Sequence, residues 1–75
     1  KPLTAVNVAC LNAFEDGAVV DAAALIEKGI LHDCKYGLKV LANGTLTKKV
    51  TVQATAFSEG AKAKIEEVGG KAEVV

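Results

Sequence analysis

The stretch KVLANGTLTKKVTV (Lys39–Val52) has strand-like residues on both sides of an Asn-Gly pair, and this pattern decides the fold class. The β-branched residues Val and Thr favour extended chain. Asn43 and Gly44 both tolerate positive φ, so the pair predicts a tight turn and, by itself, a hairpin. Two adjacent lysines, Lys48 and Lys49, follow the turn. The rest of the chain must show whether they only solvate a scaffold or belong to a binding surface.

The same order of elements occurs before and after the middle of the chain. Residues 50–57 alternate between apolar and polar side chains, which is typical of a strand with one buried face. We predict strands over residues 5–11, 18–20, 37–42 and 50–57, helices over 22–29 and 59–68, and a closing strand over 71–75. The expected fold is α/β (α+β): a small single domain over residues 1–75, with two strand–strand–helix units plus a closing strand.

Local signals place the ends of both helices. Asp21 and Ser58 are suited to N-cap the first and the second helix. Gly29 supplies a left-handed stop for the first, and a Gly-Gly pair ends the second. The second helix has Ala61, Ile65 and Val68 on one face, and we expect that face to form the core together with Val50 and Val52.

Composition limits the possible functions. The chain has 75 residues, of which 51% are hydrophobic, and nine basic residues balance nine acidic ones. Disorder is excluded, and this neutrality counts against a domain that binds nucleic acid by charge alone. No apolar run is long enough for a membrane span, so we expect no membrane partner. Since the chain starts at Lys1-Pro2 and not at Met, we expect it to be a piece of a longer protein.

No catalytic or metal-binding constellation is present. His32-Asp33-Cys34 lacks the Cys-x-x-Cys or His-x-x-x-His clip of a structural zinc site, and Cys10 is the one further sulfur. Ser58 has no nucleophile elbow, and its role at a helix start is the better one. We therefore predict no enzyme activity, no cofactor and no metal. Two cysteines are too few for a disulfide framework, which favours free thiols and a reducing cytoplasmic setting.

The lysines are the strongest functional signal. Between residues 35 and 49 there are four lysines and no acid. Because the chain has few aromatic residues, a bound RNA would be held by its phosphates and not read through stacked bases. We predict that RNA contacts Lys35, Lys39, Lys48 and Lys49. Adjacent strand residues point to opposite faces, so one member of the Lys48-Lys49 pair is expected to contact RNA directly.

The motifs in this order resemble a known family. KVLANGTLTKKVTV followed by AFSEGAKAKIEEVGGKAEVV (residues 56–75) is similar to the C-terminal part of bacterial large-subunit ribosomal protein fifteen, and residues 6–30 resemble the preceding unit. The resemblance implies a non-enzymatic protein of the cytoplasmic ribosome, bound to large-subunit ribosomal RNA and to neighbouring ribosomal proteins, and a monomer outside the ribosome. It also implies a basic, glycine-rich N-terminal extension ahead of Lys1.

The chain departs from the family pattern at a few positions. Ala42 stands where the family usually has Gly, and Glu59-Gly60 where it usually has Lys-Ser. Residues 31–37 are less basic than their counterpart. These departures weaken an RNA contact at the start of the second helix and make Lys62 and Lys64 less certain contacts.

A rival interpretation is a protein-interaction module. The terminal strand over residues 71–75 is apolar enough to offer an exposed edge to a partner strand. Salt dependence distinguishes the two classes, because counterion release makes RNA affinity fall steeply with salt.

Overall fold

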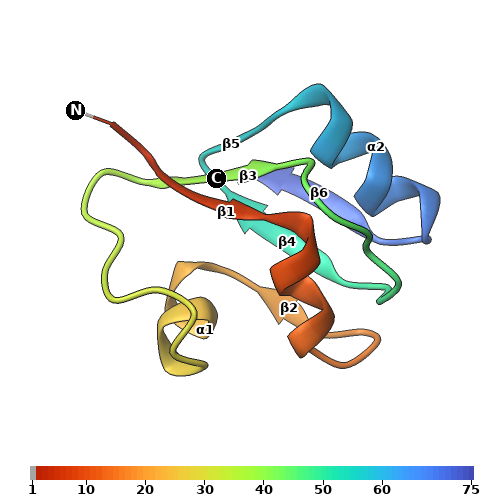
Figure 1. Cartoon of the computed structure of the whole chain (residues 1–75), viewed down its shortest axis with the longest axis horizontal. Helices are drawn as coiled ribbons and strands as arrows, with labels where there is room; N and C mark the ends of the chain where they lie inside the picture. Colours follow the sequence, from red (N-terminus) through yellow and green to blue (C-terminus); the bar gives the residue numbers. More distant parts are fainter. Residues whose placement is uncertain (1) are drawn as a thin grey trace.

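The computed structural model describes residues 2–75. The described part contains strands, two α-helices and one 3-10 helix (Figure 1). In chain order these are β1 (Thr4–Asn7), η1 (Val8–Ala13), β2 (Val19–Val20), α1 (Ala22–Glu27), β3 (Leu38–Leu41), β4 (Thr51–Ala54), β5 (Ala56–Phe57), α2 (Glu59–Glu67) and β6 (Lys71–Val74). The α/β class and the strand–strand–helix order, closed by a strand, are confirmed.

The strands form two three-stranded sheets, and every pairing is parallel. Sheet A has the order β1-β3-β5 and sheet B the order β2-β4-β6. Successive strands therefore alternate between the sheets along the whole chain. Parallel neighbours cannot be joined by a tight turn, and here the chain crosses to the other sheet and returns before each new strand is added.

The core lies between the two sheets. Val40 in β3 pairs with Val6 and Phe57, and Val52 in β4 pairs with Val20 and Ala72. Val40, Val52 and Val20 are fully buried. Leu11 of η1, Leu25 of α1 and Ile65 of α2 complete the core, and none of the three has any exposed surface. The predicted core positions Val50, Val52, Ala61 and Ile65 are confirmed, and Val68 packs at its margin.

Both helix starts are capped as predicted. The Asp21 carboxylate accepts a hydrogen bond from the Ala24 N–H at 2.9 Å, and the Ser58 hydroxyl accepts one from the Ala61 N–H at 3.2 Å. Gly29 follows α1 with φ of +78°. These contacts fix where each helix leaves its sheet.

The predicted hairpin at Asn43-Gly44 is wrong. β3 and β4 lie in different sheets, and residues 42–50 connect them along η1. Gly44 has φ of +90°, but no described non-glycine residue has a positive φ, so Asn43 does not adopt the conformation that a type I′ turn requires. The connection is held by Asn12, whose amide donates to the Thr45 carbonyl at 2.7 Å and accepts from the Thr47 N–H at 2.9 Å.

Two predicted strands are shorter than expected. Residues 50–57 form two strands, β4 in sheet B and β5 in sheet A, because the chain bends at Thr55, whose hydroxyl accepts from the Leu38 N–H at 3.2 Å. Ala56 therefore joins sheet A instead of continuing the buried face of β4. Residues 5–11 form a strand only as far as Asn7. Beyond it, a 3-10 helix buries both Val8 and Leu11, which lie one 3-10 turn apart.

Candidate nucleic-acid interface

The lysines divide into those that hold the fold and those that are free. Within residues 2–75, the Lys28 ammonium donates to the Ala13 carbonyl at 3.1 Å, and the Lys64 ammonium donates to two carbonyls of the 42–44 segment at 2.7 Å each. The other described lysine side chains make no hydrogen bond or ion pair with the described protein. All four lysines predicted to bind RNA are in this free group: Lys35, Lys39, Lys48 and Lys49.

Lys39 lies on the outer face of sheet A. Its neighbours in β3, Leu38 and Val40, are buried, so Lys39 points away from the core. In register with it stand Ala5 of β1 and Ala56 of β5, which are too small to cover it. Lys35 is exposed in the loop ahead of β3. Lys35 thus stands three residues ahead of β3, and Lys39 is the second residue of that strand.

Lys48 and Lys49 precede β4 and are not part of a strand. Lys48 is half-buried and Lys49 exposed. The Lys49 backbone is fixed from both sides, since its N–H donates to the Asp16 carboxylate at 2.8 Å and its carbonyl accepts from the Gly17 N–H at 2.7 Å. On sequence grounds, strand alternation was expected to place Lys48 and Lys49 on opposite faces. Since neither residue is in a strand, that alternation does not explain why the two lysines differ in exposure.

The structure separates the four lysines into two pairs. The Thr55 N–H, just beyond the end of β4, donates to the Leu38 carbonyl at the start of β3, so these two strands start at opposite ends of the molecule. A strand of four residues spans about 13 Å. Figure 1 shows the same separation: the loop before β3 lies on the left and the connection before β4 on the right. One short RNA segment would not contact both pairs through a single phosphate.

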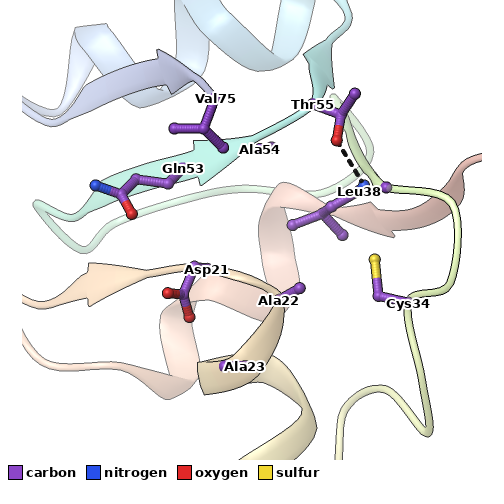
Figure 2. Close-up of a pocket in the computed structure, with 10 residues that line it drawn as sticks. Asp21, Ala22, Ala23, Cys34, Leu38, Gln53, Ala54, Thr55 and Val75 are labelled. Carbon is purple, nitrogen blue, oxygen red and sulfur yellow. Dashed lines mark hydrogen bonds between the residues drawn. The ribbon is translucent and has the colours of Figure 1, made fainter.

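A cavity of about 300 Å³ lies at the carboxyl ends of the sheet B strands (Figure 2). Its polar side chains already have partners: Asp21 caps α1, Thr55 accepts from the Leu38 N–H, and the Gln53 amide donates to Glu73 at 3.1 Å. Cys34 contributes a thiol to an otherwise small and apolar lining. This cavity therefore offers no free acid–base pair to a substrate.

Among the described residues, the side chains considered for catalysis or metal binding do not come together in a reactive arrangement. The Ser58 hydroxyl is engaged at the start of α2, and His32 is exposed in the loop after α1. In the described part of the chain, no group of three or more His, Cys, Asp or Glu side chains could hold a metal ion. Nor does any described helix have the length and apolar character needed to cross a membrane.

Comparison with known proteins gives the family. Residues 5–73 match the family that comprises ribosomal proteins 50S-L15 and 50S-L18e and their 60S counterpart. The chain belongs to this ribosomal protein family. It is 54% identical over 70 residues to large ribosomal subunit protein uL15 of Agathobacter rectalis, which covers 93% of this chain and 48% of the relative. It is 52% identical over 75 residues to uL15 of Lachnoclostridium phytofermentans, covering 100% of this chain and 51% of the relative.

The chain spans about half the length of the uL15 relatives it matches. The resemblance stated from the sequence is thereby confirmed, and the family is one of ribosomal proteins, not of enzymes. Ala42 and Gly60, two positions expected from the sequence to depart from the family pattern, are neighbours in space. A Cβ added to Gly60 would lie 2.8 Å from the Ala42 Cβ, so Ala42 and Gly60 fit together sterically.

Sequence reasoning does not separate the roles of the lysines. Lys64, a less certain RNA contact on sequence grounds, is bonded to the protein at two carbonyls. From the sequence, Lys71 is only part of a terminal strand that could offer an edge to a partner. In the structure Lys71 is exposed, follows Gly69-Gly70, and lies at the same edge of sheet B as Lys49. Nothing in the order of residues brings Lys71 and Lys49 together, because they are far apart in the chain and only the parallel pairing of β4 and β6 does so.

Proposed function

We propose that this chain is a non-enzymatic structural part of the large subunit of the cytoplasmic ribosome, where it binds large-subunit ribosomal RNA and neighbouring ribosomal proteins. The observation that carries the proposal is the family match over residues 5–73, together with relatives named large ribosomal subunit protein uL15. Free lysines on a fold without a reactive site agree with that role.

The RNA contacts are to phosphates, through Lys48 and Lys49 at one end of the molecule and Lys35 and Lys39 at the other. The support is that none of these ammonium groups is bonded to the described protein. Four lysines release at most about four counterions, and nonspecific binding of this kind has a Kd of about 10⁻⁴–10⁻⁶ M at physiological salt. The chain alone is therefore expected to bind RNA weakly, and to be a monomer outside the ribosome.

The position of this domain in a longer protein is also a proposal. We infer that residues 1–75 are the C-terminal domain, and that a basic, glycine-rich segment precedes them. The relatives are about twice as long, which leaves room for such a segment. The test is the gene sequence upstream of Lys1, where a run of Lys, Arg and Gly codons is expected and an acidic or apolar run would contradict the proposal.

The function is tested by titrating the chain with transcribed fragments of large-subunit ribosomal RNA at several salt concentrations. We expect affinity to fall linearly on a log–log plot against salt. The double variant Lys48→Ala/Lys49→Ala should bind more weakly and give a slope smaller by about one to two units. Lys62→Ala, which removes one free charge from the exposed side of α2, is the matched control.

Two results would count against this proposal. If RNA affinity did not depend on salt concentration, the RNA would not be held through its phosphates. A shallower slope for Lys62→Ala, with Lys48→Ala/Lys49→Ala unchanged, would place the binding face on α2.

The second candidate is a protein-interaction module. β6 is an edge strand of sheet B, and Val74 and Val75 at its end are 72% and 75% exposed. A partner strand could pair with this edge through backbone hydrogen bonds. Such binding would change little between low and high salt, and Val74→Ser, which changes no charge, would weaken it without affecting RNA affinity.

A further inference from the structure

Three chain segments meet at the amino-terminal edge of sheet B. Each segment leads into one of the three strands of sheet B. The segments meet because parallel strands all start at the same edge of their sheet. Backbone hydrogen bonds join them: the Thr51 N–H donates to the Ala18 carbonyl at 2.9 Å, and the Lys71 N–H donates to the Val50 carbonyl at 3.0 Å. This edge therefore joins the three segments through backbone hydrogen bonds, and it carries lysines from two of them.

Gly69 determines where the Lys49 side chain lies. The β4–β6 register begins with Thr51 and Lys71, so Lys49 and Gly69 each stand two residues ahead of a paired strand. A Cβ added to Gly69 would lie 2.8 Å from the Lys49 Cε, so the lysine stem runs across the glycine. Gly69 has φ of +88°, a conformation that favours glycine. The Lys49 ammonium is thus directed toward the β6 side of the sheet.

Lys71 stands on the same face. Its row of the sheet contains Val19 and Thr51, while the next row contains the buried Val20 and Val52. The row with Lys71 therefore points outward. Lys71 is exposed and, like Lys49, its ammonium has no partner in the described protein. Two ammonium groups without a partner in the described protein therefore lie at the amino-terminal edge of sheet B, Lys71 in the first row of β6 and Lys49 two residues ahead of β4.

Two acids near the lysines, Asp16 ahead of β2 and Glu73 further along β6, have other hydrogen-bond partners. One Asp16 carboxylate oxygen is bonded to the Lys49 backbone N–H, and one Glu73 oxygen accepts from the Gln53 amide at 3.1 Å. Neither acid makes an ion pair with Lys49 or Lys71 in the structure. Two like charges side by side repel each other, and an anion placed between them removes that cost. Consecutive phosphates of a nucleic acid strand supply such charges at close spacing.

We propose that Lys71 forms, with Lys49, a phosphate-contacting pair for ribosomal RNA on the outer face of sheet B. This inference rests on the proposed function and adds to it a residue from a distant part of the chain. The occupant is an RNA backbone, because the pair offers two cations and no aromatic side chain for stacking. Lys48, in the same segment as Lys49, lies beside the pair.

The test compares two single-charge deletions in the 75-residue chain. Lys71→Ala and Lys62→Ala each remove one exposed, free lysine, and circular dichroism first checks that both variants are folded. Each is titrated with the same large-subunit ribosomal RNA fragment from low to physiological salt. Lys71→Ala should weaken binding by about threefold or more and lower the salt slope by about one unit, whereas Lys62→Ala should match wild type.

A second readout locates the contact. In ¹⁵N-labelled wild type, the backbone amides of Gly17, Gly69 and Lys71 should shift as RNA is added, and these shifts should shrink in Lys49→Ala. If Lys71→Ala and Lys62→Ala had equal affinities and equal salt slopes, the proposal that Lys49 and Lys71 form a phosphate-contacting pair would be wrong. In that case, salt-dependent binding of the wild-type chain would still support the proposed function. Wild-type chain that shows no salt-dependent RNA binding would refute both.

Discussion

Ala42 and Gly60 face each other across the junction of β3 and α2, and only one of the two positions has room for a Cβ. A Cβ on Gly60 would lie 2.8 Å from that of Ala42, closer than such atoms pack. The side chain of Ala42 therefore occupies the space that a side chain at position 60 would need.

This close contact predicts an energetic coupling between positions 42 and 60. Gly60→Ala should be less favourable in the natural chain than in an Ala42→Gly background, by about 1–3 kcal/mol, because overpacking is present only in the first case. Urea unfolding of the two single variants and the double variant measures the difference. Strictly additive free energies of unfolding would mean that β3 and α2 do not touch here.

Lys64 is predicted to stabilise the protein and not to bind RNA. Its ammonium donates to the carbonyls of Ala42 and Gly44 at 2.7 Å each. Lys64→Met keeps most of the stem but leaves both carbonyls without this donor, which should cost about 1–2 kcal/mol, at the lower end for charged hydrogen bonds because the site is partly exposed. Lys62→Met on the same helix should change stability by less than about 0.5 kcal/mol. Thermal and urea melts measure the stability of both variants. If Lys64→Met and Lys62→Met changed the free energy of unfolding equally, the two Lys64 hydrogen bonds would contribute nothing to stability.

Ile65 is predicted to be the main anchor of α2. Its side chain has no exposed surface and packs in the core between the sheets. Ile65→Ala should lower the free energy of unfolding by about 2–5 kcal/mol, which is a large share of the total for a domain of this size. Glu66→Ala, one residue along and exposed, is the control and should be nearly neutral. A loss below about 0.5 kcal/mol for Ile65→Ala would contradict this packing.

Both cysteines are predicted to be free thiols. Cys10 and Cys34 are unbonded and half-buried, the first in η1 and the second beside the cavity. Thiol titration of the unfolded, unreduced chain should give two sulfhydryls per molecule, and a chelator should leave the melting temperature unchanged. Zinc found by elemental analysis, or a count of zero thiols, would be incompatible with this prediction.

The sequence by itself determined the starts of both helices and the buried face of α2. Asp21 and Ser58 mark helix starts because a short oxygen-bearing side chain can accept from the free N–H groups of the first turn, which is a contact over three residues. Ile65 and Ala61 are recognisable as core because helical periodicity puts them on one face. The family, too, was recognisable from the spacing of these residues.

The tertiary structure alone decided which strands pair. Asn43-Gly44 is compatible with a hairpin, but the buried faces of β3 and β4 belong to different sheets, and burying both outweighs a local turn preference. The bend at Thr55 is invisible in the alternation of residues 50–57, because the Leu38 N–H that holds it comes from a distant strand. Long-range contacts also give the lysines different places: Lys64 is bonded within the fold, Lys39 and Lys49 lie at opposite ends of the molecule, and Lys71 starts a strand at the edge of sheet B that Lys49 precedes. Charge can be counted along a chain, but the distances between charges are set by contacts between residues far apart in it.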